Sequence, residues 1–453
     1  RILGGGGSIN ATVFVRGNQA DFDSWARQGA AGWDYESLLP YFKRMETWKN
    51  GADEYRGGDG PIHVGVHSMD HPANAAFLHA AAEAGHPLTE DYNGKSQWGA
   101  GLVQVNQRRG TRSQASREYL RGRHGAPRPS IRTRCIVERV LFSGDRATGV
   151  EYRHRGRLHR AEALREVVLS TGTLVSPKLL MLSGIGPAAE LQSHGIPVRV
   201  DNAGVGTNLR EHATVMQRWN ATVPTLNTLG PLGAAKGLVR WVVEGRGILA
   251  ATVMHVQVMH KVDADAAAPT AQICFANFAT VREVNADGML KIKPANTDGF
   301  LVATTLLHPR STGRIRLRSA DPSATPVIEH QLLGNNDDVA DLLASMREGR
   351  TIMAQSAMAG SVADMFGEER AAEASGDWEG FVRNAATYGA HPIGTCRMGE
   401  DDEAVVDNAL RVRGVSGLRV IDASVMPTHP SGNTNAPTMM IAEKGADLIL
   451  SDR

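Results

Sequence analysis

The sequence predicts a mixed α/β protein, α+β overall, in which a discontinuous α/β domain is joined to a second domain whose mostly antiparallel sheet carries helices. Length is the first observation, because 453 residues exceed what one hydrophobic core usually supports. The second is that the chain ends in a strand, a loop and a helix, while residues 210–387 include stretches that alternate as strands do. No internal repeat or low-complexity linker separates these regions. We therefore expect the first domain to combine the beginning, the middle and the end of the chain.

Composition excludes several classes of protein. The 49 basic and 48 acidic residues nearly cancel, which gives no sign of nucleic-acid binding. The sequence has no apolar run of transmembrane length and no signal-peptide pattern. We expect a cytoplasmic protein without a transmembrane segment, with a peripheral position at a membrane as the alternative. Cys135, Cys274 and Cys396 are too few and too widely spaced for a disulfide framework or a zinc site.

Three histidines at helical spacing, His63, His67 and His71, do not predict a metal site. Pro61 and Pro72 interrupt a helix in this region, and no cluster of carboxylates completes a ligand set. We therefore expect no bound metal.

The chain opens on a glycine-rich loop. Residues 4–7 are all glycine, and Ser8, Ile9 and Asn10 follow. Glycine allows the backbone to approach a ligand closely, although a flexible loop would have the same composition. Residues 21–46 then show helical spacing around a Gly-Trp-Asp turn and supply apolar side chains for a core.

Strands are predicted over residues 130–173, with turns at 143–145 and 155–156. The sequence REVVLSTGT and the following VSPKLLMLSGIGP then read as strand, turn and helix, with the helix beginning near Ser176 and Pro177. Such a helix start suits a phosphate or a ribose, although an ordinary connection between strand and helix would look similar.

The region between residues 210 and 387 has a different sequence pattern. Alternating stretches such as ATVMHVQVMH and FLVATTLL are followed by GRIRLRS and then by a long helical pattern over residues 337–359. Alternation over several strands with a helix after them is typical of an antiparallel sheet with helices on one face. We expect this part to face the substrate.

The last part of the chain places a histidine and two amides near one helix start. The loop between the strand LRVID and the final helix holds Asn433 and Asn435, and proline is tolerated in a first helical turn, as at Pro437. We therefore expect Asn435 to be the N-cap. A helix start favours an anion or a group that becomes negative. His391 lies on a segment of small residues and prolines that can fold back here, so that a base and an amide would flank one reacting centre.

Three motifs resemble those of one protein family. The C-terminal HPIGTCRMG, GLRVIDASVMP and SGNTNAPTMMIAEKGADLI are similar to the C-terminal block of the glucose-methanol-choline (GMC) flavin oxidoreductases. The opening RILGGGGSINATVFVRG resembles the first signature of that family, and STGTLVSPKLLMLSGIGP resembles the second. The motifs occur in the order of the family and span nearly the whole chain. The sequence is therefore identified as a member, with most likeness to choline dehydrogenase and its relatives.

The resemblance implies a Rossmann-like FAD-binding domain and a separate substrate-binding domain. The implied boundaries are 1–62, 130–215 and 385–453 for the FAD-binding domain, 63–129 for a connecting or cap region, and 216–384 for the substrate-binding domain. In some members a histidine of the first loop links covalently to the flavin. The aligned position here is Ile9, so we expect non-covalent FAD.

The same resemblance assigns the cofactor contacts. The glycine-rich loop would lie along the flavin, and the backbone near Val137 would meet the adenine. Asp422 and Ala423 would lie beside the ribityl chain and the pyrophosphate, with hydroxyl or water-mediated contact from Asp422 and a backbone donor from Ala423. The start of the last helix would favour reduced flavin, which is negative toward its pyrimidine edge. The predicted cofactor-binding residues are Gly5, Gly6, Ser8, Asn10, Ala11, Val137, Asp422, Ala423, Asn433 and Pro437.

Alcohol oxidation by a flavin requires removal of the hydroxyl proton and transfer of a hydride from the same carbon to flavin N5. His391 occupies the position of the catalytic histidine of the family and is the predicted base. Asn435 is assigned the partner position, where a neutral amide can donate to the developing alkoxide. We rank His429 as a pocket or loop residue. The predicted reaction is oxidation of a primary alcohol to an aldehyde, with a quinone, a carrier or oxygen as the electron acceptor.

One part of the family pattern is missing. Family members open with a strand, a GxGxxG turn and a helix that hold the ADP half of FAD. Here Gly184 and Gly186 are followed by Pro187, and the pair Gly204 and Gly206 does not complete the spacing either. We expect a βαβ unit of about 30 residues or more before the first residue. Without it, the printed residues are expected to bind FAD poorly.

Two other functions compete with alcohol oxidation. Hydroxynitrile lyases share the fold, the FAD and the histidine, and anaerobic bleaching of the flavin by an alcohol would separate the two activities. An inactive fragment is the other alternative, and FAD binding would test it.

A neutral primary alcohol is the predicted substrate in preference to choline. A trimethylammonium group is best held by an aromatic cage, yet aromatic residues make up only 5% of the chain. In residues 245–280, which we expect to line the pocket, only Phe275 and Phe278 are aromatic. The apolar residues expected there are Ile248, Leu249, Val253, Met254, Val258 and Met259, and the alternative sources of a cage are Trp33, Trp219 and Trp241.

Overall fold

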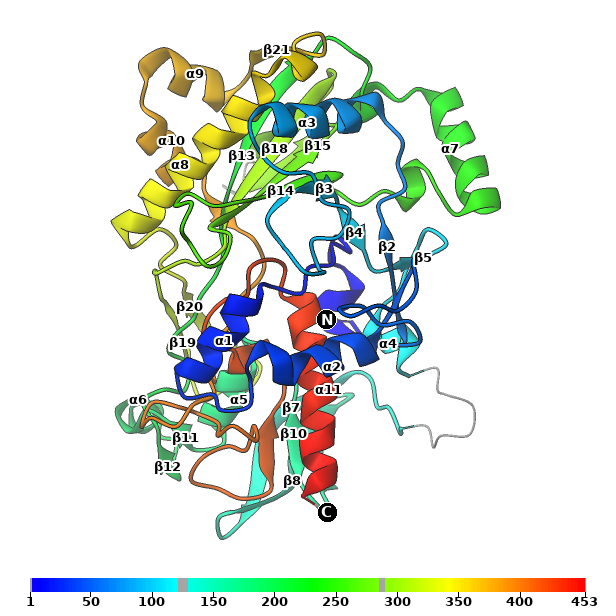
Figure 1. Ribbon diagram of the computed structural model, residues 1–453. Coiled ribbons are helices and arrows are strands. Elements are labelled where there is room, and N and C mark those ends of the chain that lie inside the picture. Colours follow the sequence, from blue (N-terminus) through cyan, green and yellow to red (C-terminus); the bar gives the residue numbers. More distant parts are fainter. Residues whose placement is uncertain (1, 121–128, 285–289, 453) are drawn as a thin grey trace.

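The computed structural model describes residues 2–120, 129–284 and 290–452. Figure 1 shows two halves, with a large sheet and its helices above and the final helix α11 (Asn435–Ser451) below. The chain passes between the halves several times. Both halves therefore contribute to the region where they meet.

The upper half is organised around a seven-stranded sheet. Along the main path its strands are β21 (Val362–Met365), β13 (Ala213–Ala221), β18 (Gly299–Leu306), β15 (Ala271–Ala276), β14 (Val256–His260) and β3 (Gly99–Leu102), and β22 (Thr387–Tyr388) also pairs with β13. Every pairing in this sheet is antiparallel. The predicted antiparallel sheet is thus confirmed. Strand β13 crosses the predicted boundary at 215/216, and β3 comes from the predicted connecting region.

Helices cover one face of this sheet. They are α3 (Pro72–Glu83), α8 (Asn336–Met353) and α10 (Trp378–Ala385). Phe275 of β15 stacks on Phe77 of α3, with ring centroids 4.5 Å apart, and Phe300 of β18 lies 5.3 Å from Phe275. Because side chains alternate along a strand, the side chains of the opposite face point away from these helices.

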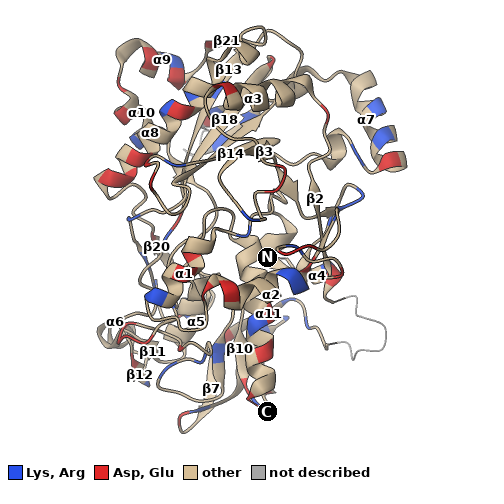
Figure 2. Cartoon of the chain, viewed as in Figure 1, with Lys and Arg blue, Asp and Glu red and all other residues tan. Residues whose placement is uncertain are grey.

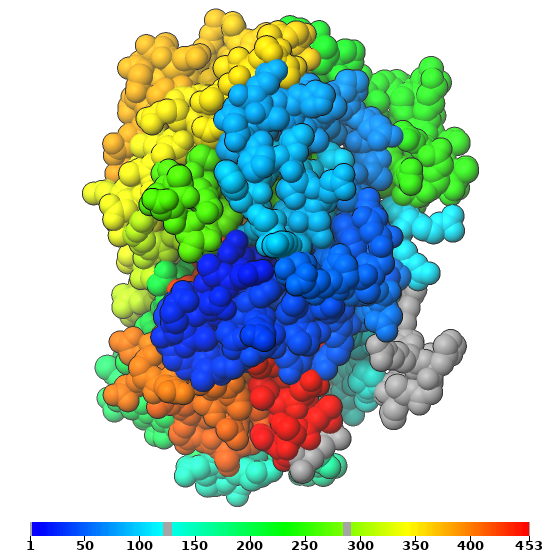
Figure 3. Space-filling view, viewed as in Figure 1, coloured from blue at the N-terminus to red at the C-terminus, as the bar shows by residue number. Residues whose placement is uncertain are grey.

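The lower half joins distant parts of the chain in one core. The parallel pair β10 (Val167–Leu169) and β23 (Leu418–Val420) lies beside the final helix, with α1 (Gln19–Arg27), α2 (Tyr35–Met45) and α5 (Ser176–Leu182) around it. One hydrophobic cluster contains Phe14, Leu180, Ile393, Val420 and Met440. In Figure 3 the blue start of the chain lies directly against its orange and red end. This core is discontinuous in sequence.

The strands predicted over residues 130–173 form as expected. β7 (Cys135–Ser143), β8 (Arg146–His154) and β9 (Arg157–Glu162) make a three-stranded antiparallel sheet in chain order. Gly144 and Gly156 lie in the turns with φ of +55° and +79°, which glycine adopts without strain.

The remaining elements connect these parts. They are η1 (Gly5–Ser8), β1 (Glu46–Trp48), β2 (Ile62–Val66), β4 (Gln104–Val105), β5 (Gln107–Arg108), β6 (Thr111–Arg112), α4 (Ala115–Glu118), β11 (Ile185–Gly186), α6 (Ala188–Ser193), β12 (Val200–Asp201), η2 (Leu226–Thr228), α7 (Pro231–Glu244), η3 (Ile248–Ala250), β16 (Thr280–Val284), β17 (Leu290–Pro294), β19 (Arg314–Arg316), β20 (Val327–Glu329), η4 (Ser356–Met358), α9 (Glu368–Ser375) and η5 (Ala423–Val425).

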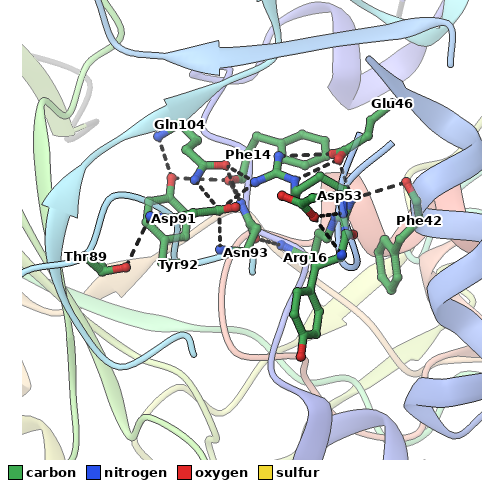
Figure 4. Close-up of polar contacts among 12 residues, drawn as sticks. Phe14, Arg16, Phe42, Glu46, Asp53, Thr89, Asp91, Tyr92, Asn93 and Gln104 are labelled. Carbon is green, nitrogen blue, oxygen red and sulfur yellow. Dashed lines mark hydrogen bonds and ion pairs between the residues drawn. The ribbon is translucent and has the colours of Figure 1, made fainter. Parts of the chain in front are cut away.

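A buried charge network fixes the segment that follows the glycine-rich loop. Arg16 pairs with Glu46 at 2.5 Å, and Arg56 pairs with the same carboxylate at 2.8 Å and with Asp91 at 2.6 Å. The backbone N–H of Arg16 donates to the side chain of Asn93 at 2.8 Å. Figure 4 shows Arg16 between Glu46 and Asn93. Since both arginines and Glu46 are fully buried, removal of one partner would leave an unpaired buried charge. The glycine-rich loop is thus tied to a rigid support.

Candidate active site

His391 is the middle member of a row of three hydrogen-bonded side chains. Its Nδ1 lies 3.1 Å from Nδ1 of His212, and its Nε2 lies 2.9 Å from Nδ2 of Asn433. His212 immediately precedes β13, and Asn433 lies in the loop before α11. The site therefore stands where the sheet of the upper half meets the final helix of the lower half.

The partners of the row fix which ring nitrogens carry hydrogen. Nε2 of His212 lies 3.0 Å from the carbonyl oxygen of Leu307, which can only accept, so Nε2 of His212 is protonated and its Nδ1 has a lone pair. His391 then donates from Nδ1, and its Nε2 accepts from the amide of Asn433. Burial lowers the pKa of His391 to about 4 and that of His212 well below its ordinary value. His391 thus presents the lone pair of a neutral imidazole, as a general base must.

Glu211 and His429 hold the backbone of this row in place. One carboxylate oxygen of Glu211 accepts from the backbone N–H of His212 at 2.9 Å and from that of His391 at 2.8 Å. Burial raises the pKa of Glu211 to about 7. Nε2 of His429 lies 3.0 Å from the carbonyl oxygen of His391, and burial lowers the pKa of His429 to about 3. The prediction that His429 is a pocket or loop residue agrees with this position.

The glycine-rich loop has one open side. A Cβ added to Gly5 or Gly6 would meet no atom within 4 Å, and the side chain of Ile9 is 74% exposed. A Cβ on Gly7 would lie 3.3 Å from Oδ1 of Asn435, which brings the loop against the start of α11. A bare backbone beside open space can accommodate a large ligand at close range.

The other side of this loop is fixed by polar contacts within the protein. The hydroxyl of Ser8 donates to the carbonyl oxygen of Leu3 at 2.8 Å. Arg112 donates to both the side chain and the carbonyl oxygen of Asn10. The carbonyl oxygen of Ala11 accepts from the hydroxyl of Thr252. The side chains of Ser8 and Asn10 are therefore occupied, and the groups that remain for a ligand belong to the backbone.

The start of α11 differs by one residue from the prediction. Thr434 is the N-cap and forms no side-chain cap, while Asn435 is the first helical residue. Pro437 is buried in the first turn. The predicted N-cap role of Asn435 is thus wrong, because the helix begins one position earlier. An uncapped helix start leaves N–H groups that favour a negative group nearby.

Asn433 occupies the position beside His391 that we had expected for Asn435. Its amide nitrogen contacts the ring of His391, whereas the side chain of Asn435 lies against the glycine-rich loop. The oxygen Oδ1 of Asn433 is buried without a hydrogen-bond partner among the described residues. The amide beside His391 in this structure is therefore that of Asn433, and the amide against the glycine-rich loop is that of Asn435.

Asp422 does not offer a free carboxylate to a ligand. One of its oxygens accepts from the backbone N–H of Gly172 at 2.9 Å and from the hydroxyl of Ser176 at 2.6 Å. The other accepts from the backbone N–H and the hydroxyl of Ser424. The expectation of a hydroxyl or water-mediated contact from Asp422 is therefore corrected, because this buried carboxylate joins β23, η5 and the start of α5. Ala423, which begins η5, is half-buried beside it.

Val137 lies on the outer strand of the three-stranded sheet. β7 has a strand partner on one side only, and the register shifts between Val137 and Arg139. An edge strand keeps backbone donors and acceptors without a strand partner. This is the kind of group that the predicted adenine contact requires.

The face of the large sheet that points toward the row carries buried polar side chains, such as Thr214 and Arg218, as well as an apolar cluster. Met216 lies on the same side of β13 as His212, because the two are separated by an even number of residues. A cluster on this face contains Cys274, Ala276, Leu301, Ala303, Met216, Met254 and Phe278. No carboxylate belongs to this cluster, which consists entirely of described residues.

Several residues predicted to line a pocket lie elsewhere. Phe275 and Val258 pack under α3 in the core on the far side of the sheet, and Met259 belongs to a core cluster with Tyr92. Trp33 and Trp219 are core residues, and Trp241 lies on α7 with its N–H donating to the carbonyl oxygen of Gly110. Met254 and Phe278 are the members of the predicted set on the site face. Alternation places Val258 and Phe275 on the side covered by α3, whereas Met259 lies on the other side of β14.

Sequence reasoning missed His212 and Glu211. They directly precede an ordinary strand, and no motif spacing relates them to His391, which is 179 residues later than His212. Their adjacency to each other was the only available signal, because it places two titratable residues at the entry of a buried strand.

The described residues offer neither a membrane span nor a metal site. Across residues 2–120, 129–284 and 290–452, no helix is long and apolar enough to cross a membrane. Within the same ranges no group of three or more His, Cys, Asp or Glu side chains could hold a metal ion. All three cysteines are free.

The chain is similar to known proteins of one family along most of its length. Residues 1–214 match the N-terminal region of the GMC oxidoreductases, and residues 309–442 match the C-terminal region. Mitochondrial choline dehydrogenase of Homo sapiens is 39% identical over 460 residues, which cover 99% of this chain and 75% of that protein. The oxygen-dependent choline dehydrogenase of Photobacterium profundum is 39% identical, over 100% of this chain and 79% of that protein.

Solved structures agree with these relatives. Formate oxidase of Aspergillus oryzae superposes with a TM-score of 0.89 at 25% identity, covering 100% of this chain and 84% of that one. An FAD-dependent oxidoreductase of Chaetomium thermophilum gives a TM-score of 0.88 at 25% identity, covering 100% and 86%.

Proposed function

The chain belongs to the GMC oxidoreductase family, whose members use FAD and act on CH–OH groups, and we propose that it oxidises a neutral primary alcohol to the aldehyde with His391 as the base. The observation that carries this proposal is the row formed by His212, His391 and Asn433. It keeps a neutral imidazole lone pair and an amide donor side by side.

The row can accept the proton of an alcohol and can also donate a hydrogen bond to the alcohol oxygen. A hydroxyl that replaces the contact between Asn433 and His391 can donate its proton to Nε2 of His391. The same oxygen can accept from Nδ2 of Asn433, which stabilises the charge that develops as the proton leaves. His212 keeps the ring of His391 in the required tautomer, as a fixed second partner does for a catalytic histidine. Proton removal at this position is the part of the reaction that the chain itself supplies.

The open side of the glycine-rich loop supports FAD as the cofactor. Gly5, Gly6 and the backbone of Ala11 would lie along it, Asn435 and the start of α11 would meet its polar edge, and the edge strand at Val137 would meet the adenine. FAD supplies the hydride acceptor when bound. Ile9 has no nucleophilic atom, which supports non-covalent binding. We assign the lower half, with its parallel pair β10 and β23, to a Rossmann-like FAD-binding domain.

A neutral substrate is favoured by the site face of the sheet. Its cluster contains methionine, leucine, alanine and one phenylalanine, Phe278, but no carboxylate. A trimethylammonium group would lack an aromatic cage there, and the nearby carboxyl of Glu211 is held by the backbone N–H groups of His212 and His391. Met216 and Met254 instead offer adaptable apolar contact, which suits an alkyl chain. The relatives at 39% identity are named choline dehydrogenases, one of them oxygen-dependent, and they support oxidation of a CH–OH group.

Anaerobic flavin reduction tests this proposal directly. The FAD-loaded protein is mixed with a medium-chain primary alcohol or with choline, and the flavin absorbance is followed in the protein and in a His391→Ala variant. We expect the neutral alcohol to bleach the flavin faster than choline and the variant to bleach it slowly. Faster bleaching by choline would contradict the substrate class. Cyanide release from a cyanohydrin without any bleaching by alcohols would identify a lyase instead.

A further inference from the structure

Helix α7 is a long surface helix with its apolar side turned outward. None of its 14 residues is buried. The exposed fractions of Leu232, Val239, Val242 and Val243 are 70%, 62%, 65% and 68%. A surface helix normally turns its apolar stripe toward the core. The orientation of α7 therefore requires an explanation outside the fold.

Contacts on the inner side fix this orientation. A Cβ on Gly237 would lie 2.5 Å from the side chain of Ile248, so glycine permits the close packing of α7 on η3. The indole N–H of Trp241 donates to the carbonyl oxygen of Gly110 at 3.0 Å. Leu232, Val239 and Val243 are spaced by seven and four residues and so lie on one side, opposite Trp241. The helix cannot turn these side chains inward without breaking both contacts.

The exposed side chains form one surface with their neighbours. We define the α7 patch as the eight apolar residues that are 40 to 70% exposed on and beside this helix, Leu229, Leu232, Leu238, Val239, Val242, Val243, Leu249 and Val253. Figure 1 shows α7 projecting from the edge of the upper half. A contiguous apolar surface of this kind marks an interaction site.

Unpaired basic residues surround the α7 patch. Lys236, Arg246, Arg108 and Arg109 are exposed and form no ion pair among the described residues. Arg240 is paired with Asp70 and with Glu244, the only acidic residue of the helix. Most of α7 is tan in Figure 2, with charge confined to a few positions. Apolar side chains rimmed by free positive charge complement an anionic, partly apolar surface.

We propose that the α7 patch docks this protein on the surface of an anionic lipid bilayer. The apolar side chains enter the boundary between headgroups and acyl chains, and Lys236, Arg246, Arg108 and Arg109 lie among the anionic headgroups. An amphipathic helix with basic flanks binds membranes in this way without spanning them. A second copy of the chain would bring the same unpaired positive charges face to face, which disfavours self-association.

The α7 patch lies beside the side of the glycine-rich loop that is fixed by polar contacts within the protein. Trp241 contacts Gly110 in the turn between β5 and β6, and Thr252, adjacent to Val253 of the α7 patch, donates to the carbonyl oxygen of Ala11. Docking would turn this side of the site toward the bilayer. Apolar alcohols and a lipid-soluble electron acceptor dissolve in the bilayer and could reach the site from it. The docking itself rests on the α7 patch and not on the proposed reaction.

Co-sedimentation with vesicles tests the docking. Vesicles of phosphatidylcholine with one quarter phosphatidylglycerol, and vesicles of phosphatidylcholine alone, are incubated with the protein at low and at high salt. We expect binding to the anionic vesicles, weakened at high salt because exposed charges are screened. The Val239→Ser/Val243→Ser variant should bind about tenfold more weakly. Lys236→Gln/Arg246→Gln should lose binding to anionic vesicles in particular.

A matched control is Leu164→Ser, which removes an apolar side chain that is 99% exposed outside the α7 patch. It should bind like the unchanged protein, and circular dichroism should show that all variants remain folded. Equal binding by the control and the Val239→Ser/Val243→Ser variant would overturn the proposal. It would also be overturned if light scattering showed a dimer that this variant dissociates, because a second copy would then cover the α7 patch.

Discussion

Replacing Glu211 by glutamine tests how ionisation of the Glu211 carboxyl affects the stability of the protein. This carboxyl binds the backbone of both His212 and His391. Glutamine keeps an oxygen that can accept from the backbone N–H groups of His212 and His391, but it cannot ionise. Burial raises the pKa of Glu211 from 4.5 to about 7. The unfolded chain ionises this carboxyl above pH 4.5, whereas the folded protein keeps it protonated until about pH 7.

The sign of the effect follows from proton binding. Between these two pKa values the folded protein binds more protons than the unfolded chain, so the free energy of unfolding falls as pH rises. The stabilisation by the protonated carboxyl is complete below pH 4.5 and is lost as pH rises through about 7. The pKa difference corresponds to about 3 kcal/mol. As pH rises from 4.5 to about 7, the free energy of unfolding of Glu211→Gln should therefore increase by about 3 kcal/mol relative to that of the unchanged protein.

The measurement is urea unfolding of the flavin-free protein and the variant at several pH values. His391 and His429 also titrate differently on unfolding, but they do so in both proteins and cancel in the difference. Glu90→Gln is the control, because Glu90 is exposed and forms no hydrogen bond or ion pair among the described residues. Parallel stability curves for the protein and Glu211→Gln would refute the reasoning, since they would mean that Glu211 ionises normally in the fold.

Four further substitutions test the site. His391→Ala should retain FAD but lower the rate of flavin reduction by an alcohol about 10² to 10⁴-fold; an unchanged rate in stopped-flow measurements would remove His391 from the reaction. Asn433→Ala should lower the same rate by about 10² to 10³ through loss of the amide donor, while Asn435→Ala should mainly weaken FAD binding in equilibrium titrations. The reverse pattern would restore Asn435 to the partner position. Asp422→Ala should lower the free energy of unfolding by about 3 kcal/mol or more, because several buried donors lose their hydrogen-bond acceptor. A change below about 1 kcal/mol in urea unfolding would show that these donors find other partners.

Local signals in the sequence predicted much of the fold. The turns at Gly144 and Gly156 were recognisable from their composition, and both glycines have the positive φ that such turns use. Alternation predicted the antiparallel sheet, and the helical pattern after it became α8. These features depend on neighbours within a few residues, which a sequence displays directly.

The assignment of side chains to the site depended on contacts that the sequence does not display. Asn433 and Asn435 are equally plausible amides in one loop, and a helix that begins one residue early decides which of them meets His391. Phe275 was expected in a pocket, but α3 covers its side of the sheet and stacks Phe77 on it. Alternation separates the two faces of a strand without indicating which one a distant helix will cover.

The separation of His212 from His391 also has a consequence for biosynthesis. The two rings meet across 179 residues, and Asn433 comes 42 residues after His391. A ribosome adds about 5 to 20 residues per second and releases the N-terminal part first, so the glycine-rich loop and the sheet emerge before the final helix can join them. Contacts of such long range also slow refolding. The sheet is therefore synthesised before the loop that completes the row, and His391 gains its amide partner only after Asn433 has emerged.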